Sequence, residues 1–499
     1  MMREAGVLLP LSALPSEYGV GEMGKFSFQF VDLLKRGKVS IWQILPLNPL
    51  GFGNSPYQPY SSLAGDEIYI SLEELFKEGL LEEKPPVFYE SKEYVEYESV
   101  RKYKEIFLRK AFHTFIPDQE YQTFAAQAWV GNYAVFITLK KKNNLRCWNE
   151  WSKPHKEWIS TRKFDVSVYQ DDIQYEIFVQ YIFYKQWMKL KQYANLNGIK
   201  IMGDIPFYVG IDSLDVWANQ NCFLLRRDGT PHFIAGVPPD YFSETGQRWG
   251  NPIYDWKHQE KDGFGFWLDR ITYNSKLFDI IRIDHFRAFD TYWRIPAECE
   301  TAVDGKWVEA PGYAVLERIQ TELPDVEIIA EDLGELRKEV HELKDHFGLK
   351  GMKIVQFAFD PEEDNNDFED IENLVIYTGT HDNQTITGWY QSQSKETQIK
   401  IREELIKLGY KGAHISEQFI RYTLDSIAIT AILPLQDILG FGDEARINTP
   451  GTLGSPNWEW KLTDFKHLEQ KLEFLAEAIM TSKRAKTDEY EEWKGLEEC

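Results

Sequence analysis

Short apolar runs recur along the chain, and most of them end in polar or aromatic residues. Runs of this length that are rich in β-branched side chains are typical of strands buried on both faces, as in a parallel sheet. We count eight such runs, at residues 6–11, 40–47, 199–209, 278–289, 326–330, 352–359, 374–377 and 427–435.

Helical patterns separate several of these runs, at residues 311–322, 334–347 and 395–408. Alternation of strand and helix predicts parallel pairing. Eight such units would close a (β/α)₈ TIM barrel, whose active site lies at the carboxyl ends of the strands, where the polar residues of these runs fall. A doubly wound open sheet would alternate in the same way, but no G-x-G-x-x-G motif follows an early strand. The barrel is therefore favoured.

Two intervals are too long to be simple connections. Residues 65–198 carry helical patterns at 94–115 and 172–195, and we interpret the interval as an inserted, mostly helical subdomain. Residues 210–276 mix Gly, Pro and aromatic residues in a loop-like way, and we interpret them as an inserted substrate-binding loop region. A merely structural insertion is the alternative for the second interval.

The residues that follow the eighth run are helical in pattern and charged. They number about sixty, too few for a separate C-terminal β-sandwich domain. Residues 1–499 are therefore expected to form a single catalytic barrel with insertions.

The formal net charge of -23 argues against nucleic acid or an anionic membrane surface as a partner. Residues 5–14 are apolar, but Pro10 interrupts them and no clean small-residue cleavage site follows, so a signal peptide is not favoured. No apolar run approaches the ~20 residues that span a bilayer. The cysteines are far apart and form no C-x-x-C pair, which argues against a zinc site or a disulfide framework. We expect a soluble, cytoplasmic protein.

The fourth apolar run ends in charged residues. Side chains alternate along a strand, so Arg282, Asp284 and Phe286 are expected on one side. A nearby guanidinium would hold the carboxylate of Asp284 ionised, which suits a nucleophile or an electrostatic stabiliser. The alternative is a structural ion pair at a strand end.

Three acids follow apolar runs: Asp284, Glu331 and Asp382. Because adjacent strands lie about 4.8 Å apart, acids at neighbouring strand ends can face each other at ~5–5.5 Å, as in retaining glycosidases. One carboxylate then attacks the anomeric carbon, and the other first donates and later removes a proton. We expect Arg282 to keep Asp284 ionised, and burial with the acidic neighbour Asp332 to keep Glu331 protonated.

The chain resembles the α-amylase clan and, more narrowly, the amylomaltases, or 4-α-glucanotransferases. The matching motifs occur in the expected order from near residue 6 to residue 460. They are residues 55–58, 203–206, 238–252, 282–287, 330–334, 356–360, 378–383 and 455–458.

The resemblance implies a (β/α)₈ barrel with inserted subdomains and no C-terminal β-domain. It implies that Asp284 is the nucleophile, Glu331 the acid/base and Asp382 the transition-state stabiliser. Further residues match positions that support catalysis or bind substrate, namely Arg282, His381, Tyr57, Asp204, Trp249, Asn251 and Asn457. After Asp204 the chain departs from α-amylases and lacks their Asn-His ending, as amylomaltases do, so we expect no structural calcium and no cofactor.

The implied reaction moves α-1,4-glucan segments from a donor maltodextrin to the 4-hydroxyl of an acceptor glucan or glucose. Transfer exceeds hydrolysis only if the acceptor is oriented, for which effective molarities of ~10⁵–10⁸ M are attainable. We expect Tyr241, Phe242, Trp249 and Tyr254 to stack the acceptor and exclude water.

Three alternatives remain. The first is an α-amylase-like retaining hydrolase, which shares the covalent intermediate. The second is a non-catalytic glucan-binding protein, which would be expected to lack a catalytic carboxylate, whereas this chain has all three. The third is a phosphate-binding barrel enzyme, for which the chain has neither a Walker-type motif nor a basic balance.

Overall fold

The computed structural model describes residues 3–88, 93–239, 243–334, 336–359 and 371–485. Tyr241, Phe242 and Cys499 therefore lie outside the described residues. The described chain is built around one eight-stranded parallel sheet, in the order β10-β11-β12-β1-β2-β3-β6-β9. Its strands are β1 (Glu4–Leu8), β2 (Ile41–Gln43), β3 (Lys200–Ile205), β6 (Ile280–Ile283), β9 (Glu327–Ala330), β10 (Gly351–Ile354), β11 (Leu374–Tyr377) and β12 (Thr430–Pro434).

The two ends of this sheet meet between β9 and β10. A parallel bridge joins Ile329 to Lys350, and the N–H of Ala330 donates to the carbonyl of Lys350 at 2.8 Å. The sheet thus forms a ring, and the predicted (β/α)₈ barrel is confirmed. Each of the eight apolar runs contains or overlaps one of the eight barrel strands.

Several runs extend beyond their strands, and the fourth and the third show why. The fourth leaves β6 at Ile283 because His285 adopts a left-handed φ of 53°, after which Phe286–Phe289 form a buried 3-10 turn. The third leaves β3 at Ile205, before Pro206, which has no N–H to donate to a neighbouring strand. Both apolar extensions are buried but are not strand.

The interior of the ring holds its own cluster of buried side chains. Met202, Ile280 and Ile329 belong to it, together with Leu8, Ile41, Met352, Ile354, Val375, Tyr377 and Ile432. Side chains two residues apart on a strand point to the same side. Asp204, Arg282 and Glu331 are therefore placed by the strands above this layer, at the carboxyl end of the ring.

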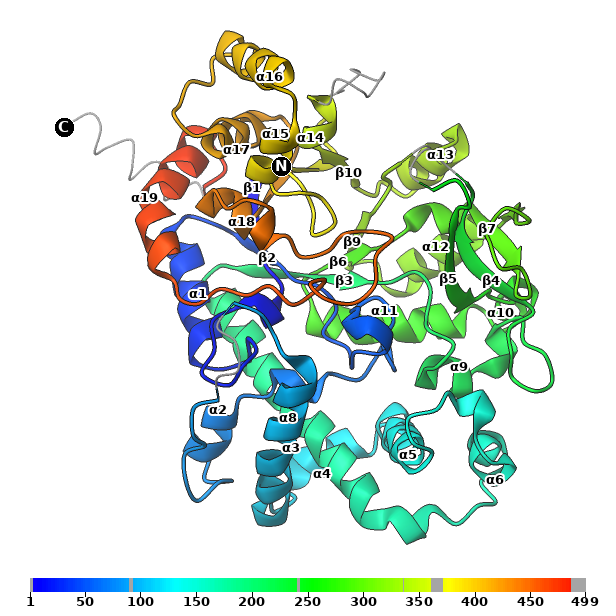
Figure 1. Ribbon diagram of the computed structural model, residues 1–499. Helices are drawn as coiled ribbons and strands as arrows, with labels where there is room; N and C mark the ends of the chain where they lie inside the picture. Colours follow the sequence, from blue (N-terminus) through cyan, green and yellow to red (C-terminus); the bar gives the residue numbers. More distant parts are fainter. Residues whose placement is uncertain (1–2, 89–92, 240–242, 335, 360–370, 486–499) are drawn as a thin grey trace.

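Helices surround the ring (Figure 1). They are α1 (Lys25–Arg36), α11 (Gly265–Leu277), α12 (Gly312–Glu322), α13 (Lys338–His346), α14 (Val355–Ala358), α15 (Ile386–Ser392), α16 (Lys395–Lys407), α17 (Ile415–Asp425), α18 (Leu435–Leu439) and α19 (Lys466–Thr481). The helical patterns at residues 311–322 and 395–408 match α12 and α16 to within one residue at each end.

Residues 65–198 contain a further group of helices, in the lower part of Figure 1. These are α2 (Leu72–Lys77), α3 (Tyr97–Thr114), α4 (Gln119–Ala125), α5 (Ala128–Lys142), α6 (Lys153–Lys156), α7 (Trp158–Thr161) and α8 (Gln170–Leu196). The long helix α8 packs against both α5 and α1, so it connects these helices to the barrel. Whether residues 65–198 form a separate subdomain remains a prediction.

Residues 210–276 differ from the loop-like expectation. They contain α9 (Leu214–Ala218), β4 (Phe233–Val237), β5 (Gln247–Pro252), α10 (Trp256–Lys261) and α11. With β7 (Thr291–Pro296) and β8 (Lys306–Glu309), the strands β4 and β5 form a second, four-stranded antiparallel sheet in the order β5-β4-β7-β8. The sequence did not reveal β4 and β5, because buried and exposed residues do not alternate regularly along them. The partner of β4 is β7, which lies beyond β6 in the chain, so no local hairpin pattern marks this sheet either. All four strands follow β3 or β6, so this sheet belongs to the face of the barrel at the strands' carboxyl ends.

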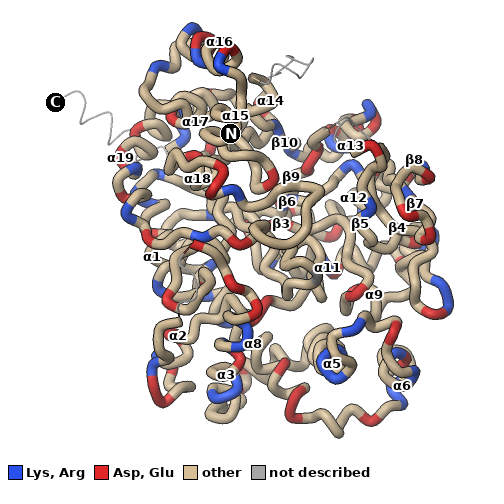
Figure 2. Tube along the Cα trace, in the orientation of Figure 1, with Lys and Arg blue, Asp and Glu red and all other residues tan. Residues whose placement is uncertain are grey.

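Charged side chains of both signs are distributed over the helices, as α3 and α16 illustrate (Figure 2). After β12 the described chain continues through α18 and α19 to residue 485 and forms no further strand there. Within the described ranges, no helix has the length and apolar character needed to cross a membrane.

Candidate active site

Asp284 and Glu331 leave neighbouring strands at the same level. Ile283 of β6 pairs with Ala330 of β9, and the two acids are the next residues in each strand. The backbone continues this alignment, because the N–H of Glu331 donates to the carbonyl of Ile283 at 3.0 Å. Neighbouring strands lie about 4.8 Å apart, so the structure brings the two predicted acids together at the mouth of the ring.

Arg282 connects Asp284 to a third carboxylate. Its Nη1 lies 2.7 Å from both carboxylate oxygens of Asp204, and its Nη2 lies 3.2 Å from Oδ1 of Asp284. The side chains of Arg282 and Asp204 are buried, whereas 30% of the Asp284 side chain is exposed. One guanidinium therefore serves two acids, and the better contact goes to Asp204.

Backbone N–H groups hold the carboxylate of Glu331. The N–H of Leu333 donates to its Oε1 at 3.0 Å, and the N–H of His285 donates to its Oε2 at 2.7 Å. The left-handed conformation of His285 redirects the chain after this residue, directly beyond Asp284. The two acids are thus oriented by one short segment of chain.

Burial raises the pKa of both acids. For Asp284 burial is the main cause, Arg282 acts in the opposite direction, and Glu331, Asp204 and Asp382 raise the pKa further. For Glu331 burial is again the main cause, opposed by Arg282 and by the two N–H donors. Arg282 lowers the pKa of Asp284, as expected, but burial outweighs one guanidinium that Asp204 shares, so the net direction is upward. That Asp284 is the ionised acid of the pair remains a prediction. The expectation of a raised pKa for Glu331 agrees with the structure.

Tyr57 and His381 extend the site on the side of Asp204. The hydroxyl of Tyr57 donates to Oδ2 of Asp204 at 2.7 Å and lies 2.9 Å from Nε2 of His381. The hydroxyl has one hydrogen, and it is used in the hydrogen bond to Asp204. In the contact with His381 the hydroxyl oxygen is therefore the acceptor, and the N–H at Nε2 of His381 is the donor. Burial lowers the pKa of His381, which keeps the ring neutral. The two rings stack at 5.3 Å between centroids.

Asp382 lies next to His381, with its Oδ1 3.5 Å from His381 Nε2, and 45% of its side chain is exposed. Asn448 donates from Nδ2 to Oδ1 of Asp382 at 2.7 Å, and Arg446 donates to the backbone carbonyl of Asp382 at 2.7 Å. Sequence reasoning missed Asn448 and Arg446. They lie in a segment without regular hydrophobic periodicity, more than sixty residues from Asp382, so no local pattern could have identified them.

Trp249, in β5 of the second sheet, contacts His285, the residue that follows Asp284. Its indole lies edge-on to the ring of His285 at 4.8 Å, and Gln58 donates to its carbonyl at 3.0 Å. Burial lowers the pKa of His285 to about 3, so this ring is neutral as well. Trp249 is therefore placed beside the segment that directly follows Asp284.

Asn251 and Asn457, also predicted to bind substrate, make hydrogen bonds within the protein. Nδ2 of Asn251 donates to the carbonyl of Val209 at 3.0 Å, which ties β5 to the segment that follows β3. Asn457 accepts from the N–H of Thr449 at 2.8 Å and donates to Thr452 at 2.9 Å. Both side chains hold loops at the site, and within the described part of the chain neither hydrogen-bonds to the three acids.

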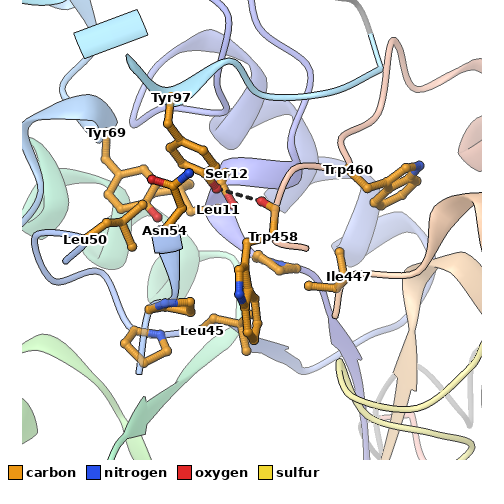
Figure 3. Close-up of a pocket in the computed structure, with 13 residues that line it drawn as sticks. Leu11, Ser12, Leu45, Leu50, Asn54, Tyr69, Tyr97, Ile447, Trp458 and Trp460 are labelled. Carbon is orange, nitrogen blue, oxygen red and sulfur yellow. Dashed lines mark hydrogen bonds between the residues drawn. The ribbon is translucent and has the colours of Figure 1, made fainter. Parts of the chain in front are cut away.

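Trp458, directly after Asn457, packs against the rings of Tyr57 and His381 at 5.9 Å from each. Its backbone carbonyl accepts from the hydroxyl of Tyr97 in α3 at 2.7 Å (Figure 3). A helix of the 65–198 interval thereby fixes the loop that covers Tyr57 and His381.

Comparison with known proteins agrees with this geometry. A family model described as 4-alpha-glucanotransferase matches residues 9–468. The chain belongs to the 4-α-glucanotransferase family. The family prediction made from the sequence is therefore confirmed, and so is the prediction of a transferase rather than a non-catalytic binding protein.

Relatives and solved structures of this family match almost the whole chain. The 4-alpha-glucanotransferase of Aquifex aeolicus is 40% identical over 96% of this chain and 99% of its own length. The 4-alpha-glucanotransferase of Synechocystis sp. is 42% identical over 92% of this chain and 94% of its own length. The amylomaltase from Streptococcus agalactiae in complex with acarbose superposes with a TM-score of 0.91 at 35% identity, covering 97% of this chain and 100% of that one.

Proposed function

We propose that Asp284 and Glu331 carry out a double displacement that transfers α-1,4-glucan segments with retention of configuration. In the first step a carboxylate oxygen of Asp284 attacks the anomeric carbon, while Glu331 gives its proton to the departing glycosidic oxygen. The bond from that carbon to oxygen breaks, an ester to Asp284 forms, and the shorter glucan leaves with the proton.

In the second step the same two groups act in reverse. Glu331, now a carboxylate, takes the proton from the 4-hydroxyl of an acceptor glucan or glucose. The acceptor oxygen attacks the anomeric carbon, the ester breaks, and the carboxylate of Asp284 is restored. The observation that carries this mechanism is the common level of Asp284 and Glu331 on adjacent strands, which suits the ~5–5.5 Å separation of retaining enzymes.

The surroundings supply the charge states that the steps need. The site holds several carboxyl groups and one buried guanidinium, so a proton bound by the Asp284–Glu331 pair is favoured. We assign the proton to Glu331, because Asp284 contacts Arg282 at 3.2 Å and Glu331 makes no ion pair in the described part of the chain. Asp382 and His381 then stabilise the oxocarbenium-like transition state through the sugar hydroxyls.

The remaining site residues divide between the two halves of the substrate. Tyr57, Asp204 and Arg282 surround the sugar that reacts with Asp284, with Asn457 supporting their covering loop. Trp249, placed by Asn251, offers an aromatic face to the acceptor beyond Glu331. The bound acarbose named for the Streptococcus agalactiae amylomaltase supports a maltooligosaccharide substrate for this chain. The described cysteines are unpaired thiols, which supports a cytoplasmic location.

Incubation with maltotriose tests transfer against hydrolysis. Transfer yields glucose and longer maltodextrins, while the number of reducing ends stays constant. A steady rise in reducing ends, with maltose and glucose as the final products, would instead indicate an α-amylase-like hydrolase. Replacing Asp284 by Asn is expected to abolish both outcomes while sparing binding of maltodextrin.

A further inference from the structure

Asp437 is a buried acid outside the constellation of catalytic groups. It lies in α18, three residues after the end of β12, and only 1% of its surface is exposed. Its Oδ2 accepts from the hydroxyl of Thr378 at 2.6 Å, and its Oδ1 accepts from the N–H of Ile386 at 2.8 Å. The described chain provides it with no lysine or arginine as an ion-pair partner. Burying such a carboxylate is unfavourable unless its hydrogen bonds compensate.

The two donors have a particular position in the chain. Thr378 directly follows β11, and Ile386 is the first residue of α15. They are the two ends of a segment, residues 378–386, that contains His381 and Asp382; we call it the Asp382 loop. One carboxylate thus closes this loop at its base.

Other side chains contact the Asp382 loop in its middle or at its helix end. Arg446 and Asn448 bind Asp382 itself. Gln356 donates to the carbonyl of Gln384 at 2.7 Å, and Asp443 accepts from the side chain of Gln384 and the N–H of Thr385. Within the described ranges, neither Gln356 nor Asp443 hydrogen-bonds to Thr378. Asp437 is the side chain that joins the strand end of the loop to its helix end.

We propose that Asp437 is a positioning residue, which sets the place of Asp382 and His381 against the reacting sugar by fixing both ends of their loop. This inference rests on the proposed function, because it takes Asp382 as the transition-state stabiliser. A carboxylate suits the task, since each of its oxygens accepts from one donor, whereas an amide has a single acceptor oxygen. Burial raises the pKa of Asp437 to about 6, so the group is ionised and accepts from both donors at neutral pH.

The test replaces Thr378 by Val, which removes one end of the link and leaves the catalytic groups unchanged. A 1 Å displacement of a catalytic group can lower the rate about 10²-fold, so kcat for maltotriose transfer is expected to fall by about 10-fold to 10²-fold. The KM for maltotriose is expected to stay within about threefold, because Asp382 acts mainly in the transition state. Thr378→Ser, which keeps the hydroxyl, should restore kcat.

The matched control is Thr423→Val in α17. Thr423 is also fully buried, and its hydroxyl donates to the carbonyl of Phe419 at 2.8 Å, a bond that the valine removes. Thr423 makes no hydrogen bond to the Asp382 loop in the described part of the chain. Its thermal midpoint should fall less than that of Thr378→Val, because its lost hydrogen bond goes to a neutral carbonyl of the same helix. Its kcat should stay at the wild-type value. Asp437→Asn, which keeps an acceptor for Ile386, should give a kcat between those of the wild type and Asp437→Ala.

Equal kcat values for Thr378→Val and Thr423→Val would overturn the inference, and so would a loss in Thr378→Val that appears in KM alone. Both results would leave the proposed function intact, because the wild-type enzyme would still transfer glucan. A wild-type enzyme that only hydrolyses maltotriose would overturn the proposed function instead, whatever the variants do.

Discussion

Asp284 and Glu331 stand one residue beyond the paired positions Ile283 and Ala330 of β6 and β9. A further backbone hydrogen bond, from the N–H of Phe286 to the carbonyl of Glu331 at 3.0 Å, locks the two strand ends together after the acids have emerged. The distance between the two carboxyl groups is therefore governed by backbone pairing on both sides and not by flexible loops. Such rigid support is what a two-carboxylate mechanism requires.

Glu331→Gln should separate the two roles of the acids. The amide cannot protonate a departing sugar oxygen, so kcat/KM for maltotriose is expected to fall about 10²–10⁴-fold. With α-maltosyl fluoride as donor, formation of the glycosyl-enzyme should remain fast, because fluoride leaves without a proton. Pre-steady-state fluoride release measures this step. Glu327→Gln, earlier in the same strand, should behave as the wild type with both donors.

The pH dependence of kcat/KM for maltotriose should be bell-shaped, with an acid limb and an alkaline limb. On the acid side, kcat/KM falls as Asp284 takes up a proton, and on the alkaline side it falls as Glu331 loses its own. Burial raises the pKa of both groups, so both limbs should lie above the ordinary range of exposed carboxyls. An alkaline limb that is unchanged in the residual activity of Glu331→Gln with maltotriose would remove Glu331 from that role.

The raised pKa values of Asp284 and Glu331 should make the folded state less stable as the pH rises. A carboxyl whose pKa is raised by folding binds its proton more tightly in the folded state than in the unfolded state. These two groups therefore stabilise the fold at low pH, and that contribution is lost as pH rises through their folded pKa values. Asp284→Asn should remove part of this dependence, so that its thermal midpoint falls less than the wild-type value between pH 5 and pH 8. A midpoint difference that does not change with pH would contradict the raised pKa.

Tyr57→Phe should weaken the reaction without removing it. The hydroxyl links Asp204 to His381, while the stacking of the ring on His381 would remain. Loss of a hydrogen bond to a charged group is worth about 1.5–3 kcal/mol, so kcat/KM is expected to fall by about 10-fold to 10²-fold. Steady-state kinetics with maltotriose provide the measurement. Tyr60→Phe, a half-buried tyrosine nearby in the chain, should leave kcat/KM unchanged.

A buried ion pair supports the helices below the barrel. Nζ of Lys104 in α3 lies 2.5 Å from Oε2 of Glu22 and donates to the carbonyls of Ile68 and Ile70 at 2.6 and 2.8 Å. Lys104→Met leaves Glu22 buried and unpaired, which typically costs about 3–5 kcal/mol. A clear drop in the thermal midpoint is expected, and Lys104→Met with Glu22→Gln should recover part of it. An unchanged midpoint in the single variant would show that the pair is not needed.

The sequence predicted the barrel because each of its strands is buried on both faces and leaves a continuous apolar run. It could not predict the β5-β4-β7-β8 sheet, because that sheet combines strands from two separate connections. Asn448 and Asp437 also escaped prediction. Each acts on the Asp382 loop from more than fifty residues away through single hydrogen bonds, which leave no periodic pattern.

The acids themselves were found in a different way. Their positions after apolar runs suggested strand ends, and strand alternation placed Arg282 and Asp284 on one side, in agreement with the ion pair between them. The net upward direction of the pKa of Asp284 was not part of the prediction, because it depends on burial and on the sharing of Arg282 with Asp204. Both of these arise only when β3 and β6 lie side by side.

The most direct test of the account is to trap the covalent intermediate. Glu331→Gln treated with α-maltosyl fluoride in the absence of an acceptor should gain the mass of one maltosyl group. Peptide mass spectrometry should locate that group on Asp284, and the same treatment of the variant that also carries Asp284→Asn should give no adduct. An adduct on another carboxylate, or turnover to a product of inverted configuration with no adduct on Asp284, would contradict the account.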